Sequence, residues 1–298
     1  MIRSRLAPTP SGYLHLGNAI NFILTWLLVR RAGGILGLRI DDADAARTRP
    51  EYVEDIFRQL EWLGLDWDRG PSGPGNFTAY HSQLQRLDRY RALFEELRRS
   101  GVIYYCTCSR SLVNRHSHGG RYPGTCRLRR VIPDAPHTIR VRAPHSLEMG
   151  DFVLWRRDDL PAYQLASLAD DLAEGSNLIV RGRDLEPSSN AQLFLAAQLG
   201  GRGKVFCRAQ FIHHPLLCAE SGCKLAKSDQ SLSLAAMRQA GIKPVDIYRE
   251  AAKLLGATPG KVESLTDLLN DYDLTDRLGV TAGTSPPGQR WQNSCRHK

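Results

Sequence analysis

The sequence lacks any apolar run long enough to cross a lipid bilayer. Its longest apolar stretch, residues 19–29, is interrupted by Asn21 and Thr25 and is far shorter than the roughly 20 residues of a spanning helix. An apolar leader is also missing, because two prolines occur within the first ten residues. We therefore expect a cytoplasmic protein without a membrane partner.

Acidic residues are outnumbered, with 31 Asp and Glu against 40 Lys and Arg, which gives a net charge of +9 and a pI near 9.3. Such an excess favours polyanionic partners, nucleic acid above all, although a merely basic soluble protein fits the composition equally well. The length of 298 residues allows a sizeable core. Seven cysteines, an odd number without an export signal, favour reduced thiols or metal ligands over disulfides.

The apolar pattern predicts an α/β fold. Residues 2–6 resemble a strand, residues 18–31 a helix and residues 35–40 a second strand. This order is a βαβ unit, which implies a parallel sheet. Further helices are predicted from Pro50 and over residues 84–97, α/β patterning over 152–199, and three short helices at 232–240, 245–255 and 262–269.

Residues 104–145 break this rhythm, being rich in Cys, His, Arg, Gly and Pro. Cys106 and Cys108, with Cys126 after a polar loop, suit a structural four-coordinate zinc ion. His116 and His118 are the usual fourth ligands by chemistry, and spacing alone does not choose between them and another donor. The nearby Arg127, Arg129 and Arg130 favour a solvated face, with RNA phosphates as an alternative.

Two motifs predict a nucleotide site. His15 and Gly17 open the first predicted helix, where backbone amides and the helix dipole favour a phosphate. Far downstream, Lys227 and Ser228 end a Lys-Leu-Ala-Lys-Ser stretch that begins at Lys224 and offers a mobile charge and a hydroxyl to phosphate. Each motif alone is weak, but their order makes coincidence improbable.

With these motifs, the chain resembles the catalytic core of class I glutamyl-tRNA synthetases over residues 3–230. The resemblance rests on five collinear stretches: Arg-Leu-Ala-Pro-Thr-Pro-Ser-Gly from Arg5, His-Leu-Gly-Asn from His15, Arg39-Ile40-Asp41-Asp42, Val180 to Asp184, and the Lys-Leu-Ala-Lys-Ser stretch. It is more similar to the truncated glutamyl-Q tRNA(Asp) synthetases. About seventy residues follow the last motif, leaving no room for an anticodon-binding domain, and Tyr105 to Cys108 and Tyr122 to Cys126 match that group's zinc segments.

The resemblance implies a Rossmann-like class I catalytic domain with a zinc-bearing insertion and a short helical C-terminal region. We expect halves of the catalytic domain at 1–103 and 146–230, the insertion at 104–145, helices at 231–284 and a disordered tail at 285–298. It also implies ATP binding through His15, Gly17, Asn18, Lys224, Lys227 and Ser228, with His15 and Lys227 catalytic, and glutamate binding through Arg5, Ala7, Thr9, Asp41, Tyr163 and Arg181. Tyr122 becomes the fourth zinc ligand beside Cys106, Cys108 and Cys126.

Three positions depart from the family pattern. Asp41 replaces the usual Glu, Asn18 replaces a frequent His, and Ser167 replaces a frequent Asn. The expected activity is ATP-dependent formation of glutamyl-adenylate, with Mg²⁺ bound to ATP. The glutamate is then transferred to queuosine at the wobble position of tRNA(Asp). The enzyme is expected to be a monomer. A divergent enzyme that charges the tRNA 3′ end, another acid-adenylating enzyme of this fold and a non-catalytic zinc-containing RNA-binding protein are the alternatives.

Overall fold

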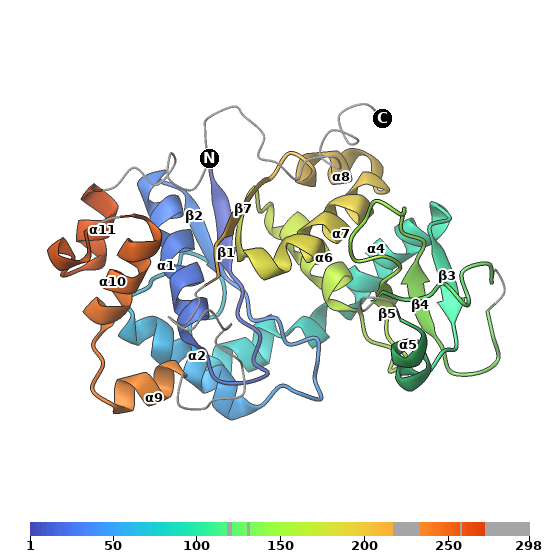
Figure 1. Cartoon of the computed structure of the whole chain (residues 1–298), viewed down its shortest axis with the longest axis horizontal. Helices are drawn as coiled ribbons and strands as arrows, with labels where there is room; N and C mark the ends of the chain where they lie inside the picture. The colour runs from blue at the N-terminus through green and yellow to red at the C-terminus, as the bar shows by residue number, and fades with distance from the viewer. Residues whose placement is uncertain (118–120, 130–131, 217–232, 257, 272–298) are drawn as a thin grey trace. The chain divides into compact units, whose positions relative to one another are not determined.

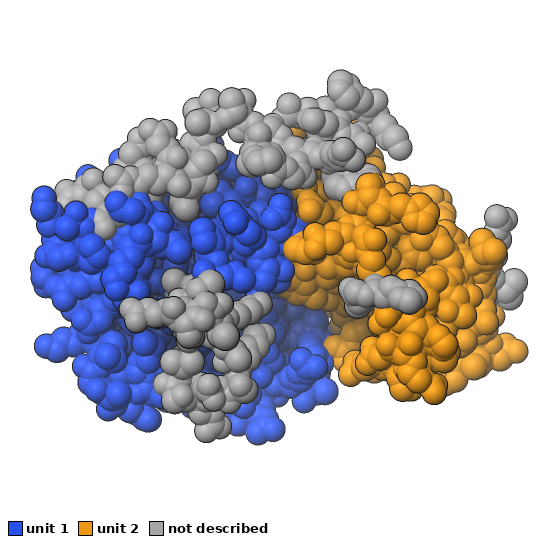
Figure 2. Space-filling view, in the orientation of Figure 1, with its two compact units in different colours: residues 1–85, 176–186, 209–289 blue, residues 86–175, 187–208, 290–298 orange. Residues whose placement is uncertain are grey.

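The computed structural model describes residues 1–117, 121–129, 132–216, 233–256 and 258–271, which fold into two compact units. In this part of the chain, unit 1 contains residues 1–85, 176–186 and 209–271, and unit 2 contains residues 86–175 and 187–208 (Figure 2). Each unit therefore combines segments that are far apart in the sequence. None of the helices in the described ranges has the length and apolar character needed to span a membrane.

Unit 1 contains parallel strands. Strand β1 (Arg3–Leu6) pairs with β2 (Ile35–Leu38), and β6 (Leu178–Gly182) pairs with β7 (Gln210–His214), both in parallel. The two pairs meet where the Asn177 amide donates to the Arg3 carbonyl (3.0 Å) and Ser4 Oγ donates to the Leu178 carbonyl (2.8 Å). The resulting order is β2-β1-β6-β7, and the predicted parallel α/β class is confirmed.

Helix α1 (Leu16–Arg31) packs on one face of these strands and contributes more residues to the core of unit 1 than any other described helix or strand. Leu6, Leu38, Val180 and Ile212 supply the strand side of that core. Helices α10 (Pro244–Leu254) and α11 (Leu265–Asp271) contact α1, and Figure 1 shows them on the side away from the strands. The apolar residues of α1 are thus buried around nearly the whole helix, which explains its strongly apolar sequence.

The remaining helices of unit 1 agree with the sequence pattern. Helix α2 (Pro50–Trp62) begins with a proline at its first position, where the missing N–H costs nothing. It is followed by α3 (Pro74–Asn76), a π-helical turn (Phe77–His81) and a 3₁₀ turn (Gln83–Arg86). After the strands come α9 (Leu234–Gln239) and a 3₁₀ turn at Pro259–Lys261. Another 3₁₀ turn, Arg183–Leu185, follows β6.

Unit 2 contains a three-stranded antiparallel sheet, with β4 (Thr138–Val141) between β3 (Ile103–Cys106) and β5 (Val153–Trp155). Its helices are α4 (Leu87–Arg99), α5 (Arg110–His116), α6 (Tyr163–Glu174) and α8 (Gly200–Phe206), together with nearly all of α7 (Glu186–Ala197). Residues 104–145, whose sequence lacks apolar periodicity, therefore contain β4 in full and all but the first residue of β3.

A buried carboxylate joins two helices of unit 2. Asp170 on α6 is fully buried and accepts a hydrogen bond from Tyr90 Oη on α4 (2.9 Å). Arg86 and Arg89 each place an Nη1 atom 3.0 Å from its Oδ1 atom. A buried charge is tolerated only when it is paired and hydrogen-bonded, so this cluster fixes α4 against α6.

Candidate active site and metal cluster

Two buried arginines lie on the face of the unit 1 strands that is opposite α1. Side chains alternate between the two faces of a strand, and Leu6 and Val180 pack toward α1. Arg5 and Arg181 therefore point to the other face, and their exposed fractions are only 4% and 3%. The structure thus places two of the predicted carboxylate-binding residues on a common face.

Asp41 is brought beside the same strands by backbone pairing. The Arg39 amide donates to the Leu6 carbonyl (2.9 Å), and the Asp41 amide donates to the Pro8 carbonyl (2.8 Å). This extends the β1–β2 pairing and brings Asp41 next to the loop that contains Thr9, an exposed residue. A glutamate site formed by Arg5, Thr9 and Asp41 is therefore compatible with the fold of unit 1.

The side chain of Asp41 already has partners within the protein. Arg39 Nε lies 2.7 Å from Asp41 Oδ1, and Gln83 Nε2 donates to the same oxygen at 3.3 Å. Arg39, Asp41 and Gln83 are all nearly inaccessible to solvent. The shorter side chain at this position is thus held on a buried arginine, which fixes its orientation.

Gln83 and Asp42 are residues to which sequence analysis assigns no role. The backbone amide of Gln83 donates to Asp42 Oδ1 at 2.6 Å, and Ser82 Oγ donates to Asp42 Oδ2 at 2.5 Å. The backbone amide of Ala43 donates to the side-chain oxygen Oε1 of Gln83 at 2.8 Å. This network joins the chain after β2 to the turn that precedes α4. No local sequence pattern signals it, because its partners are about forty residues apart.

His213 is a further titratable residue on this face. It pairs in register with Arg181 on the neighbouring strand. Burial lowers the pKa of His213 to about 4, and the positive charge of Arg181 adds to the effect. The imidazole is therefore neutral at physiological pH and can donate or accept a hydrogen bond beside Arg181.

The first nucleotide motif forms the start of α1. The helix begins at Leu16, with His15 as the residue that caps it, two positions before the predicted start. Asn18 Oδ1 accepts a hydrogen bond from the His15 amide at 3.0 Å. A Cβ atom on Gly17 would lie 3.1 Å from two atoms of the His15 ring. Asn18 thus fixes the backbone of His15, and Gly17 leaves space for its ring.

The second motif, Lys224 to Ser228, lies outside the described residues. The chain on either side of it is anchored to the start of α1 in unit 1. His214, whose pKa is lowered by burial, places Nε2 3.2 Å from Asn21 Oδ1 on α1. Ser233 forms an antiparallel bridge with His15 in the backbone, and the Leu234 amide donates to the Leu14 carbonyl at 2.7 Å.

Tyr163 and Ser167 belong to unit 2. Tyr163 is the first residue of α6, and Ser167, one turn later, is fully buried. The predicted contact of Tyr163 with glutamate stays a prediction.

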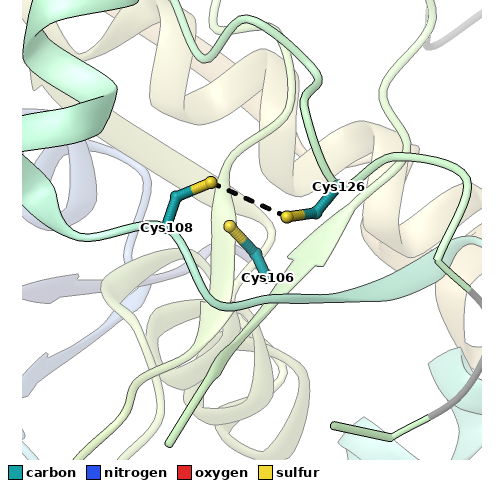
Figure 3. A group of neighbouring side chains, drawn as sticks. All are labelled: Cys106, Cys108 and Cys126. Carbon is teal, nitrogen blue, oxygen red and sulfur yellow. Dashed lines mark hydrogen bonds between the residues drawn. The ribbon is translucent and has the colours of Figure 1, made fainter. Parts of the chain in front are cut away.

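Three cysteines of unit 2 converge on one point (Figure 3). Cys106 is the last residue of β3, Cys108 follows it, and Cys126 lies in a turn after the short α5. Their sulfur atoms lie within 4.8 Å of one another, and Cys108 Sγ is 3.6 Å from Cys126 Sγ. All three are free thiols, whereas Cys207 is disulfide-bonded, so the expectation of reduced thiols does not extend to that residue.

Tyr122 reaches the same cluster. Its Oη atom lies 3.2 Å from Cys106 Sγ and 3.4 Å from Cys108 Sγ, and it accepts a hydrogen bond from the Cys126 amide at 3.0 Å. Among the described residues, no His, Asp or Glu joins the three sulfurs, and His116 is exposed at the end of α5. The other alternative, His118, lies outside the described residues.

These distances fit a zinc ion. Tetrahedral Zn²⁺ with Zn–S bonds of about 2.3 Å holds its sulfur atoms about 3.8 Å apart. The separation of 3.6 Å between Cys108 and Cys126 is close to this value. Burial opposes ionisation of Cys126, but hydrogen bonds from Tyr122 and the Thr107 amide outweigh it and lower its pKa to about 7. A thiolate, the form that binds metal, is thus accessible at neutral pH.

The arginines beside this cluster contact the protein. Arg127 pairs with the buried carboxylate of Asp151 at 2.8 Å and donates to the Ala143 carbonyl at 2.7 Å. Arg129 donates to Thr107 Oγ1 at 3.0 Å. Arg129 is exposed, as expected for a solvated face, whereas Arg127 is half-buried against Asp151. Arg130 lies outside the described residues.

Comparison with known proteins places this site in a family. A family model described as "tRNA synthetases class I (E and Q), catalytic domain" matches residues 1–145. The glutamyl-Q tRNA(Asp) synthetase of Nitratidesulfovibrio vulgaris is 38% identical over 94% of this chain and 96% of its own length.

The chain belongs to the glutamyl-Q tRNA(Asp) synthetase family.

Two further comparisons agree with this membership. The glutamate–tRNA ligase of an Anaeromyxobacter strain is 34% identical over 98% of this chain but only 65% of its own length. The crystal structure of the glutamate–tRNA synthetase of Elizabethkingia anophelis matches with a TM-score of 0.73, at 23% identity, over 98% of this chain and 70% of the other. This structural match supports the fold. The expected class I catalytic α/β fold is thereby confirmed.

Proposed function

We propose that this protein activates L-glutamate with ATP and transfers the glutamate to queuosine at the wobble position of tRNA(Asp). The observation that carries the proposal is the match to a glutamyl-Q tRNA(Asp) synthetase over nearly the full length of both chains. The buried arginines of unit 1 and the start of α1 supply groups that this chemistry needs. The protein would work as a monomer in the cytoplasm.

Glutamate presents two carboxylates and one ammonium group. Arg5 and Arg181 lie on one face of the strands, and a guanidinium can bind a carboxylate through two hydrogen bonds. In this proposal Asp41, oriented by Arg39, receives the ammonium group. The Ala7 backbone, Thr9 and Tyr163 complete the pocket.

The first step requires no protein nucleophile. A carboxylate oxygen of glutamate attacks the α-phosphorus of ATP, the bond to the β-phosphate oxygen breaks, and pyrophosphate leaves. His15 and Lys227 would stabilise the growing charge on phosphate, and Gly17, Asn18, Lys224 and Ser228 would line the nucleotide site. Mg²⁺ bound with ATP would add positive charge to the phosphates.

The second step is acyl transfer. A hydroxyl of the queuosine ring attacks the glutamyl carbonyl, its proton is lost, and AMP leaves. Because this acceptor lies in the anticodon, the tRNA presents that loop to the active site. This differs from charging, in which the terminal ribose is the acceptor.

We propose that Cys106, Cys108, Tyr122 and Cys126 hold a structural zinc ion. The sulfur separations support this set, and a closed four-ligand site is typical of structural zinc. Zinc would stabilise the chain around β3 and α5, where apolar contacts are few.

Purified protein is expected to contain about one zinc ion per chain by elemental mass spectrometry, and Cys106→Ser is expected to lose most of it, because metal binding and local folding are coupled. Leu128→Ser, which changes an exposed side chain two residues after Cys126, serves as the control. Equal zinc content in all three proteins would contradict the assigned ligands.

Transfer of radiolabelled glutamate to four tRNA(Asp) preparations tests the proposed acceptor. The tRNA contains or lacks queuosine, and in each case its 3′ end is intact or trimmed. Label in queuosine-containing tRNA, trimmed or not, would support the proposal.

The outcome also separates the alternatives. Label that requires an intact 3′ end, whatever the base, would show a charging enzyme, a candidate favoured by the 34% identity to a glutamate–tRNA ligase. Formation of adenylate from another acid would show a different ligase. Absence of both activities would favour an RNA-binding protein.

A further inference from the structure

A half-buried cationic group faces the ring of Tyr122. The guanidinium carbon of Arg140, on β4, lies 4.0 Å from the centroid of that ring. Arg140 Nη1 donates to the Asp151 carbonyl at 3.2 Å. Its Nε atom is buried and has no hydrogen-bond partner within the described residues. The ring of Tyr122 is therefore a main contact of this cation.

The neighbouring acid does not neutralise Arg140. The carboxylate of Asp151 is engaged by Arg127 Nη1 (2.8 Å), Tyr104 Oη (2.7 Å) and the Ala143 amide (2.9 Å). In the described part of the chain, Arg140 forms no ion pair. The positive charge of Arg140 would be balanced most directly by negative charge on the ring that it faces.

Other arginines contact the segment that holds the cysteines. Arg157 Nη2 donates to the carbonyls of Thr107 (3.2 Å) and Cys108 (3.4 Å). Arg129 Nη1 donates to Thr107 Oγ1 (3.0 Å). Thus two exposed arginines, Arg129 and Arg157, and the half-buried Arg140 contact the segments that hold the proposed zinc ligands.

These arginines can offset the negative charge that the proposed zinc ligands would bring together. Three thiolates and a phenolate bring four negative charges to Zn²⁺, which leaves an excess of two negative charges in a mostly buried site. Groups that contact metal ligands from outside tune orientation and affinity, and their removal typically weakens binding 10- to 100-fold. A cation over an aromatic face is also directly attractive.

We propose that Arg140 is a positioning residue that holds Tyr122 as a zinc ligand and, with Arg129 and Arg157, balances the negative charge of the loaded site. This inference rests on the proposed zinc centre. It assigns the arginines around the cluster to the metal site rather than to RNA.

Zinc affinity of the full chain, measured by competition with a chromogenic chelator, tests this role in a double-mutant cycle. Arg140→Met is expected to weaken zinc binding about 10- to 100-fold. In a Tyr122→Phe background the same change is expected to have an effect of less than about 2-fold, because the ligand through which Arg140 acts is gone. Arg98→Met, which removes an exposed arginine paired with Glu95 on α4, is the control and is expected to bind zinc normally.

A second readout separates positioning from folding. The visible spectrum of the Co²⁺-loaded protein reports the ligand set, and Arg140→Met is expected to change it while far-UV circular dichroism stays the same. Arg140→Lys, which keeps the charge but not the planar group, is expected to have an intermediate affinity.

Three results would overturn the inference. Wild-type zinc affinity in Arg140→Met would show that the arginine does not act on the metal, and a simultaneous loss of tRNA binding would assign it to RNA. An equal loss in both backgrounds would show a general structural role. A wild-type protein that binds no zinc would overturn the metal centre itself.

Discussion

Arg181→Met is expected to lower kcat/KM for glutamate in ATP–pyrophosphate exchange by about 10²- to 10⁴-fold. Arg181 is buried on β6, on the strand face opposite α1. In the variant, a substrate carboxylate bound at this face would lose its cationic partner. Leaving a buried charge unpaired costs about 3–5 kcal/mol, which corresponds to this range. The thermal unfolding midpoint is measured alongside, so that a loss of activity can be separated from a loss of folding.

Two variants make the Arg181 result specific. Arg181→Lys keeps the charge but loses the two-pronged geometry, so its activity should fall between those of Met and Arg. Arg183→Met removes an exposed arginine two residues away and should leave exchange within about threefold of wild type. Equal loss in the Arg181 and Arg183 variants would contradict a pocket centred on Arg181.

His15→Ala is expected to lower kcat of glutamate-dependent exchange by about 10²- to 10³-fold, the usual loss when one donor to a charged transition state is removed. His15 caps α1, so its imidazole lies where helix amides also point. The KM for ATP should change less than kcat, because the phosphate charge grows only in the transition state. Unchanged kcat would exclude His15 from catalysis.

Gly17→Ala tests the same site by geometry. The added methyl group would lie 3.1 Å from the His15 ring and force it to shift. A displacement of this kind can cost up to about 10²-fold in rate, so a loss smaller than that of His15→Ala is expected. Gly75→Ala is the matched control, since its methyl group would meet no atom within 4 Å.

The start of α1 shows how far local pattern can be read. Apolar spacing predicts the helix, but places its beginning at residue 18 rather than Leu16. The difference arises because the Asn18 side chain accepts the His15 amide and extends the helix toward its cap. Motif comparison treats Asn18 as a departure from a frequent His, whereas in the fold this side chain fixes the backbone of a proposed catalytic residue.

The cysteine cluster, proposed to bind zinc, shows a different limit. Cysteine spacing predicts three ligands, and chemistry favours a histidine as the fourth. The fold instead brings Tyr122 Oη within 3.4 Å of two sulfurs and leaves His116 exposed. The turn between Tyr122 and Cys126 directs the Tyr122 side chain toward the three sulfur atoms. The number of residues between the cysteines carries no information about that direction.

By itself the sequence determined the α/β class, the family, the order of the two motifs proposed to bind ATP, and the three clustered cysteines. These depend on periodicity and on residue order, which are local or collinear properties of a chain. Only the tertiary structure showed Arg39 and Gln83 holding Asp41, His213 beside Arg181, and Arg140 over Tyr122. Most of these contacts join residues that are distant in the sequence. Whether two such side chains meet depends on the space and charge around them, and these are defined only when the chain has folded.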